Sequence, residues 1–397
     1  MPAIRNARLV LKDRIEPGAV EFEGSRITAV RPGARGGAGF DANGAFLVPG
    51  FVDLHVHGGG GADFLDAQPE AFETALKFFA SRGTTSLLAT ALTASPAEMC
   101  AFLSETARAM ARSDLPSEVL GAHLEGPFLN PQQKGCHLVQ YIRNPTESEV
   151  DGYLRFVPTL RHVTIAPEID GAPEAIRRFR AAGVTVSAGH TMADERHLRK
   201  ALEAGLSHGT HLWSSMSSFH REGPFRILGA VEWLLGEDAV TTEVIADLKH
   251  LSPSFLRIAY RTKGPDRLCL VSDAMRGAGM PPGSRWRIGP EETGVEAIVE
   301  DGVGMLPDRS SLASSVTPID RMVKNVVEAV GVPLHEAIRM ASLTPARVAG
   351  VADRKGSLEA GKDADFVLLG EGLGVLGVWG RGRAVSGVAL TLSGGRA

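Results

Sequence analysis

Cysteine is scarce in this 397-residue chain. Its three cysteines, Cys100, Cys136 and Cys269, are widely separated and form no Cys-x-x-Cys pair, so a disulfide framework like that of small secreted domains is not expected. The first residues, MPAIRNARLVLKD, lack the apolar run of a signal peptide. No stretch of about 18 apolar residues predicts a membrane span either. We therefore expect a cytoplasmic protein with no membrane partner.

Positive charge is not in excess. The formal net charge is −4, which gives no basic footprint for nucleic acid, so we expect no nucleic-acid partner. Low-complexity segments and repeats of a short fixed period are also absent. What is present is ordinary globular composition, with 44% hydrophobic and 22% charged residues. The chain is long enough for one large domain and a smaller one.

The two ends of the chain share a β-rich character. Residues 1–48 form short strand-like segments separated by turns, and residues 356–397 have the same pattern. We expect the two ends to pair into one small β domain. Residues 49–355 would then be a second domain that is inserted into the first.

Residues 49–355 alternate between strand-like and helical segments. The strand-like segments are residues 50–58, 84–92, 118–126, 162–169, 183–190, 206–212, 239–247 and 267–274. The helical segments between them often begin with proline or a capping residue and end in glycine, as helices do. Eight β/α units in about 300 residues predict an α/β fold of the (β/α)8 TIM-barrel type.

The first barrel segment, PGFVDLHVHGGGG, contains two histidines one residue apart. Residues i and i+2 of a strand face the same side, so His55 and His57 point together. One interpretation is a pair of structural histidines. The other is a pair of metal ligands, because neutral imidazole is the commonest metal-binding side chain.

Further imidazoles and carboxylates stand at the carboxyl ends of the predicted strands, where barrel enzymes carry their chemistry. The full set is His55, His57, His123, Glu125, Glu168, His190, His208, His211 and Asp273. Any one of them alone could be structural; Asp273, for example, could cap a helix. Together they would meet at one mouth, where buried charge needs a partner. Such ligands suit zinc or iron, and a carboxylate not fully engaged by metal could act as a general base on water.

These residues resemble the amidohydrolase superfamily, whose barrel ligands begin with His-x-His on the first strand. The segments HLEGPFLNP, KGCH, AGHT, THLWSSM, LVSDA and MASLTPARVAG are similar to the N-acetylglucosamine-6-phosphate deacetylase family within it. The resemblance implies a small β-sandwich beside the barrel. It also implies hydrolysis of the acetamide of N-acetylglucosamine 6-phosphate to glucosamine 6-phosphate and acetate.

The resemblance further implies a role for each residue at the mouth. The main ion would be held by Glu125, His190 and His211. A second site, or support for the first, would come from His55 and His57, so one or two ions, Zn²⁺ or Fe²⁺, are expected. Asp273 would be a metal ligand and the general base that becomes the general acid. The substrate would contact Cys136, His137, Ser214, Ser215, Arg221, His250, Leu312, Ala313 and Ser314.

Two of the substrate-side residues have a specific expected task. His137 would donate to the developing oxyanion. Arg221 would bind the phosphate, because a guanidinium can hold two oxygens at once, and would do so across the interface of a homodimer. The expected partners are therefore a small amino-sugar phosphate and a second copy of the chain.

Three segments depart from the family pattern, all on the substrate side. WSSM puts Ser214 and Ser215 where an Asn-Ala pair is typical, IADLKH replaces Asp-Gly-x-His before His250, and SLASS replaces Leu-x-Gly-Ser. Another N-acyl sugar, such as N-acetylgalactosamine 6-phosphate, or a cyclic amide is therefore the alternative substrate.

Three residues at the strand ends remain. Two of them have no role in this scheme, and the third has an alternative role. We expect His123 and His208 to be structural or to support the ligands, and Glu168 is an alternative metal ligand. A catalytically inactive barrel that senses a sugar phosphate is a further hypothesis. The presence of Asp273 argues against that hypothesis, because binding alone does not need a base.

Overall fold

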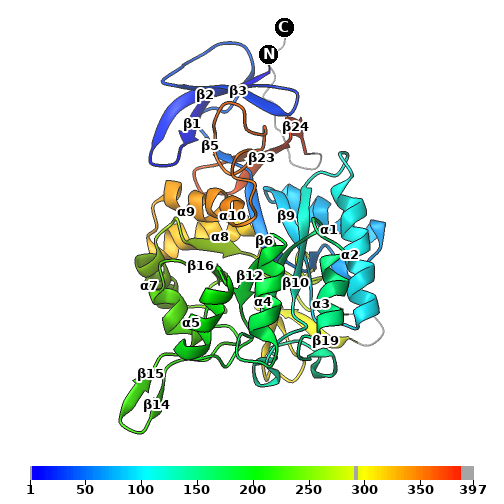
Figure 1. Cartoon of the computed structure of the whole chain (residues 1–397). Coiled ribbons are helices and arrows are strands. Elements are labelled where there is room, and N and C mark those ends of the chain that lie inside the picture. Colours follow the sequence, from blue (N-terminus) through cyan, green and yellow to red (C-terminus); the bar gives the residue numbers. More distant parts are fainter. Residues whose placement is uncertain (1, 290–293, 386–397) are drawn as a thin grey trace.

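The computed structural model describes residues 2–289 and 294–385, and within them a parallel eight-stranded barrel forms the centre (Figure 1). Its strands are β6 (Phe51–Val56), β9 (Thr84–Ala91), β10 (Glu118–Glu125), β11 (Leu160–Ile165), β12 (Thr185–Ala188), β13 (His208–Gly209), β16 (Thr241–Ile245) and β17 (Leu268–Val271). They pair in chain order, and a parallel bridge between Val56 and Ala274 joins the last strand to the first. The predicted barrel and its eight strands are confirmed.

Helices surround the barrel, and most of them match a segment whose sequence predicts a helix, namely residues 69–83, 96–112, 172–183, 193–205, 252–264, 318–331 and 333–350. These are α1 (Pro69–Ser81), α2 (Pro96–Met110), α4 (Ala172–Ala181), α5 (Glu195–Ala204), α7 (Pro253–Lys263), α8 (Ile319–Asn325), α9 (Leu334–Ala341) and α10 (Leu343–Val348). Two others, α3 (Glu147–Leu154) and α6 (Ala230–Gly236), were not predicted. None of the helices formed by residues 2–289 and 294–385 has the length and apolar character that a membrane span requires.

Local sequence explains why these helices begin where they do and which face they bury. Ser95 caps α2, and Glu98 bonds back to Ser95, which satisfies free backbone N–H groups at the helix start. On α1, the apolar positions Phe72, Leu76 and Phe79 recur at helical spacing and are fully buried against the barrel. Burial of each such side chain contributes about 1.5–3 kcal/mol.

One layer inside the barrel is polar. The hydroxyls of Thr164, Ser187 and Thr210, from three neighbouring strands, lie 2.7–3.0 Å from one another. All three side chains are buried, and each hydroxyl finds its partner within this group, as buried polar groups must. This polar layer supports the side chains at the mouth of the barrel.

Both ends of the chain contribute to one mixed sheet above the barrel (Figure 1). The first end supplies β1 (Ala3–Val10), β2 (Ile15–Glu23), β3 (Arg26–Pro32), β4 (Phe40–Asp41) and β5 (Phe46–Pro49), and the second supplies β22 (Phe366–Leu369), β23 (Val375–Gly380) and β24 (Arg383–Ala384). The strand order is β24-β23-β22-β5-β1-β2-β3, with β4 beside β1. The predicted β domain built from both ends is confirmed.

This β domain closes around a core of its own. The backbone of Ile27 on β3 bonds to Gly361 and Lys362, at 2.8 Å each, so the far edge of the sheet meets the segment before β22. Leu47 and Phe366 are fully buried in the core. The boundaries after residues 48 and 355 stay a prediction, and the part of the predicted C-terminal β segment beyond residue 385 lies outside the described residues.

Three further β elements were not predicted. A short pair, β7 (Gly58–Gly59) and β8 (Ala62–Asp63), follows the first barrel strand, and the hairpin β14 (His220–Glu222) and β15 (Phe225–Ile227) protrudes from the body (Figure 1). A four-stranded antiparallel sheet comprises β18 (Arg285–Ile288), β19 (Val295–Glu300), β20 (Val303–Met305) and β21 (Leu312–Ser315). A bridge between Ala274 and Ser315 brings β21 to the mouth of the barrel.

Candidate active site

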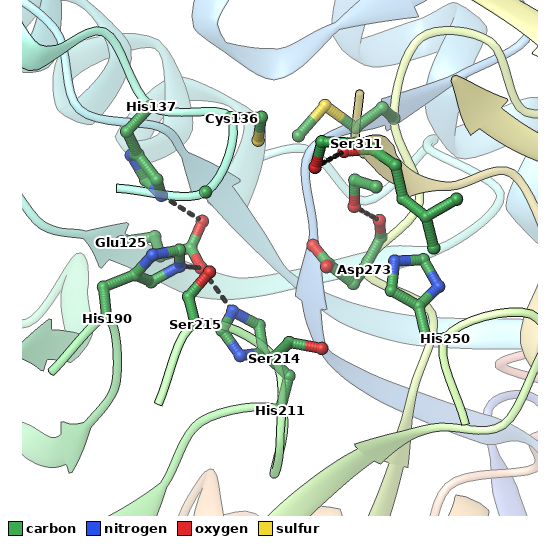
Figure 2. Close-up of a pocket in the computed structure, with 14 residues that line it drawn as sticks. Glu125, Cys136, His137, His190, His211, Ser214, Ser215, His250, Asp273 and Ser311 are labelled. Carbon is green, nitrogen blue, oxygen red and sulfur yellow. Dashed lines mark hydrogen bonds and ion pairs between the residues drawn. The ribbon is translucent and has the colours of Figure 1, made fainter. Parts of the chain in front are cut away.

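A cavity of about 270 Å³ opens at the carboxyl ends of the barrel strands (Figure 2). Its walls are Glu125, Gly135, Cys136, His137, His190, His211, Ser214, Ser215, His250, Asp273, Met275, Ser311, Leu312 and Ser314. Most of the predicted site residues are therefore brought together at one place. Figure 2 shows Asp273 across the cavity from the cluster around Glu125, with His250 on the same side as Asp273.

Glu125, at the end of β10, is the centre of the first cluster. Its Oε1 lies 2.9 Å from Nε2 of His190 and 2.8 Å from Nε2 of His211. Its Oε2 lies 3.2 Å from Nε2 of His137. These side chains come from distant parts of the chain, yet all are buried, because the barrel directs the ends of its strands to one rim.

The His-x-His pair forms a second cluster beside the first. Nε2 of His55 and Nε2 of His57 are 3.2 Å apart, so the two rings do point together as the strand pattern predicts. Oδ1 of Asp273 lies 3.4 Å from the first and 3.2 Å from the second. Glu125 joins the clusters, since Oε1 is 3.4 Å from His55 and Oε2 is 3.3 Å from His57.

Hydrogen bonds on the far side of two rings fix where their lone pairs point. Nδ1 of His190 lies 2.7 Å from the carbonyl oxygen of Gln133; a carbonyl only accepts, so Nδ1 donates. In the neutral ring the lone pair is then on Nε2, directed at Glu125, which is also an acceptor. Nδ1 of His55 donates in the same way to Glu243, 3.1 Å away. A cation between the ring nitrogens and the carboxylates would turn this repulsion into attraction.

The spacing of the ligand atoms also fits metal ions. Two ligands bound tetrahedrally at 2.0–2.1 Å from one ion are roughly 3.3 Å apart, close to the separations of 3.2–3.4 Å around His55 and His57. Three groups at the mouth could each hold an ion: His55, Glu125 and His211; His55, His57 and Asp273; and Glu125, His137 and His190. The donor set is therefore suited to one or two divalent ions.

The charges of the two clusters favour the binding of a cation, whether a proton or a metal ion. Burial disfavours charge on Glu125, but His55, His137 and His190 outweigh it and hold the pKa of that carboxyl well below its usual range. Burial likewise disfavours charge on Asp273, but His55 and His57 outweigh it and lower the pKa of this carboxyl to about 2. In the opposite sense, burial lowers the pKa of His57, but Asp273 and Glu125 raise it to about 9. Protons and metal ions therefore compete for the same ring nitrogens.

Comparison with known proteins agrees with this geometry. The model of the amidohydrolase family matches residues 46–385. The chain belongs to the amidohydrolase family. It is 35% identical over 340 residues to the N-acetylglucosamine-6-phosphate deacetylase of Vibrio furnissii, a match that covers 85% of this chain and 82% of the relative. It is 36% identical over 341 residues to the N-acetylgalactosamine-6-phosphate deacetylase of Escherichia coli O157:H7, covering 86% and 88%.

A solved structure extends the similarity to the whole fold. The N-acetyl-D-glucosamine-6-phosphate deacetylase of Mycobacterium smegmatis superposes with a TM-score of 0.89 at 34% sequence identity. The superposition covers 97% of this chain and 100% of that one. The barrel and the two-ended β domain of this amidohydrolase are therefore both present in that structure.

His137 of this amidohydrolase is a neutral hydrogen-bond donor. The backbone N–H of Thr93 donates to its Nδ1 at 3.2 Å, so the ring carries its proton on Nε2, the atom that faces Glu125. Burial lowers the pKa of His137 to about 4, which keeps the ring uncharged at neutral pH. The structure thus gives His137 the form that can donate to an oxyanion, and in this form its Nε2 is not a metal ligand, so the group of Glu125, His137 and His190 is not assigned an ion.

His250 is oriented by a residue that the sequence analysis did not single out. Oδ2 of Asp247 lies 2.7 Å from Nδ1 of His250, and its Oδ1 accepts the backbone N–H groups of Lys249 and His250. Burial opposes charge on Asp247, but His250 outweighs it and lowers the pKa of the carboxyl. In the sequence, the sign of this role is an acidic residue three positions before a histidine of the candidate site.

The expected substrate residues divide into those that reach the cavity and those that do not. Cys136 lines it, and burial raises the pKa of its thiol, which disfavours the nucleophilic thiolate form. Ala313 is buried in an apolar cluster with Met275 and Trp286 rather than in the cavity wall. Arg221 lies on the exposed hairpin strand β14 and does not line the cavity of its own chain.

Three residues at the strand ends have structural partners. His123 lies 2.8 Å from the hydroxyl of Thr164 and 3.2 Å from the carbonyl of Leu54, and His208 bonds to Thr241 and Glu243. Glu168 accepts hydrogen bonds from the side chains of Asn130 and Thr191 and from the backbone of Met192. It belongs to none of the possible metal groups among the described residues.

Met275 and Ser311, which also line the cavity, were not expected there.

Proposed function

We propose that this amidohydrolase removes the acetyl group of N-acetylglucosamine 6-phosphate, giving glucosamine 6-phosphate and acetate with the help of divalent metal. The observation that carries the proposal is the pair of carboxylates facing one cavity, Glu125 among three imidazoles and Asp273 opposite it (Figure 2). The names of relatives that span most of this chain support the substrate.

We assign the ions on the chemistry of the donors. Imidazole and carboxylate together suit Zn²⁺ or Fe²⁺. The principal ion would be held by Glu125, His190 and His211, and a second by His55, His57 and Asp273. A divalent ion bound there supplies Lewis acidity toward water and the acetamide carbonyl.

The chain's own residues then move the protons. Asp273, whose low pKa keeps it ionised, accepts a proton as water attacks the carbonyl carbon. It returns that proton to the nitrogen as the carbon–nitrogen bond breaks, so acetate and a free amine are released. The Nε2–H of His137 donates to the carbonyl oxygen as negative charge develops on it. His250, held by Asp247, would contact the sugar.

Recognition of the phosphate requires a contribution from outside this cavity. Among the described residues, no lysine or arginine lines the cavity, although a phosphate dianion is best bound by a guanidinium. Ser214 and Ser215 offer polar groups at the mouth. We therefore propose a homodimer in which Arg221 of the partner subunit reaches the phosphate from the protruding hairpin.

Acetate release from a panel of substrates tests the proposal. Purified protein is loaded with Zn²⁺ or Fe²⁺, and the bound metal is quantified on the same sample. N-acetylglucosamine 6-phosphate, its galacto epimer and unphosphorylated N-acetylglucosamine are compared, because one relative is named for the epimer. The gluco phosphate is expected to have the highest kcat/KM. Preference for the unphosphorylated sugar, or full activity after verified removal of all metal, contradicts the proposal.

A further inference from the structure

Glu243 is a fully buried carboxylate in the middle of strand β16, beneath the two ligand clusters. It does not line the cavity, so it cannot touch a substrate there. Its Oε2 accepts from Nδ1 of His55 at 3.1 Å and from the backbone N–H of His211 at 3.3 Å. Its Oε1 lies 3.1 Å from Nε2 of His208. One carboxylate thus touches a residue of each cluster from below.

We propose that Glu243 is a positioning residue that fixes the tautomer of His55 and so creates the second ion site of the hydrolase proposed above, on which this inference rests. Because Nδ1 of His55 donates to Glu243, the Nε2 lone pair of the neutral ring faces His57 and Asp273. These are the atoms that would share the second ion. A negative partner on Nδ1 also makes Nε2 a stronger ligand.

The competing tautomer shows why the carboxylate is needed. Without an acceptor at Nδ1, the proton of His55 can sit on Nε2, where Asp273 and Glu125 are both 3.4 Å away and ready to accept it. A proton in that position occupies the place of the ion. Glu243 disfavours this alternative, because a proton on Nε2 leaves the Nδ1 lone pair facing a buried carboxylate oxygen that has lost this donor, at a cost of about 1–3 kcal/mol.

Glu243 is itself held from the opposite side. The hydroxyl of Thr241 lies 2.6 Å from Nδ1 of His208. We assign this hydroxyl as the donor, which leaves the ring proton on Nε2, pointing at Oε1 of Glu243. Thr241 thus donates to His208, and His208 and His55 both donate to Glu243, so the hydrogen bonds converge on this carboxylate beneath the second ion site.

A different use of the same residues is less well supported. His162, His208 and Glu243 lie close enough together to hold an ion of their own. However, both oxygens of Glu243 already accept hydrogen bonds, and Nε2 of His162 bonds to the hydroxyl of Ser187 at 2.9 Å. Both oxygens of Glu243 and both ring nitrogens of His208 have hydrogen-bond partners without a cation, whereas Nδ1 of His162 has none. We assign this group to positioning because its carboxylate is already engaged.

The test is ion affinity in Glu243→Gln, which keeps the volume and one acceptor but removes the charge. Metal-free protein is titrated with Zn²⁺ against a competing chelator, and bound metal is counted. We expect the second ion to bind about 10–100-fold more weakly, while the first changes much less. Thr242→Val is the matched control, because its buried side chain has no hydrogen-bond partner and neighbouring strand residues face opposite sides. It should bind both ions as the unmodified chain does.

Thr241→Val tests the same idea without touching the carboxylate, and a smaller loss of second-ion affinity is expected. Unchanged second-ion affinity in both variants overturns the proposal. The proposal is also overturned if the unmodified chain saturates at one ion, or if it binds a third ion that the Glu243→Gln variant does not bind. An unmodified chain that binds two ions yet releases no acetate overturns the proposed function alone, since the comparison of affinities needs no substrate.

Discussion

The hydroxyl of Ser314 donates a hydrogen bond of 2.6 Å to the backbone carbonyl of Asp273. Both residues have left-handed backbone conformations, with φ of +64° and +44°. On its other side, the N–H of Asp273 donates to the carbonyl of His55 at 2.8 Å. The backbone of the proposed base is therefore hydrogen-bonded to strand β6 on one side and to strand β21 on the other. These bonds explain how an irregular, strained turn can hold a carboxylate in one place.

Replacing Ser314 separates the hydrogen bond from the strain. Ser314→Ala loses the bond and keeps the left-handed backbone, so we expect a loss of about 1 kcal/mol in the free energy of unfolding and a lower kcat. Ser314→Gly also loses the bond, but glycine adopts this conformation without penalty. Denaturant unfolding should rank the glycine variant above the alanine variant in stability. The reverse order would show that the backbone of Ser314 is not strained.

Replacing the proposed base should remove turnover and leave recognition intact. In Asp273→Asn the amide can no longer accept the proton of water, and general base catalysis is typically worth 10²–10⁴-fold. We expect kcat to fall by that amount with KM changed only a few-fold. Bound metal must be quantified on the same protein, because Asp273 is also a proposed ligand. A variant with normal metal content and unchanged kcat contradicts the assigned role.

The hairpin arginine is expected to affect only phosphorylated substrates. Arg221→Ala should raise KM for the sugar phosphate by about tenfold or more, because a charge-assisted contact to the phosphate is lost. The low rate with the unphosphorylated sugar should stay the same. Arg199→Ala, an exposed arginine on α5 that pairs with Glu195, is the control. An equal rise in KM for both kinds of sugar would place the effect elsewhere than at the phosphate.

Stability at acid pH should depend on Glu118, at the start of barrel strand β10. Burial raises the pKa of this carboxyl, but Arg354 and Lys355 outweigh it and lower the pKa from 4.5 to about 2. A carboxyl with a lowered folded pKa stabilises fully above pH 4.5, and this stabilisation is lost as the pH falls toward 2. A shift of this size corresponds to about 3 kcal/mol.

The pH dependence of unfolding measures this contribution. In urea unfolding between pH 6 and pH 3, Glu118→Gln should be less stable than the unmodified chain at pH 6, and the difference should shrink at pH 3. Glu328→Gln, which removes a mostly exposed carboxylate, serves as the control. A difference that stays constant across this range would show that Glu118 is not coupled to its cationic partners.

The barrel could be predicted because its strands and helices have clear patterns, whereas the added elements could not. The helix α3, ESEVDGYL, is short and contains Gly152, so its helical signal is weak. The strands β18–β21 are three to six residues long and separated by turns, and such segments carry little periodicity. The sequence likewise contains no sign that β21 would be placed against the end of β17.

The expected metal ligands and base were predicted from single residues at strand ends, and the substrate-side residues from the family resemblance. The omissions have a common cause. Glu243 and Asp247 act through another residue, so neither belongs to the ligand pattern by itself. A lone glutamate in an otherwise uncharged strand, TTEVI, is nevertheless a signal, since a buried charge requires a partner. Arg221 cannot be placed from one chain, because its proposed contact lies in a second copy.

The pairing of β5 with β22 has a consequence for how the chain is made. These two neighbours in the sheet are separated by the entire barrel, so a ribosome releases β5 long before its partner exists. Until β22 arrives, the edge of β5 presents unpaired backbone groups that can join foreign strands. We therefore expect the β domain to be completed only after the barrel segment has been synthesised, with this edge of β5 open to foreign strands until then.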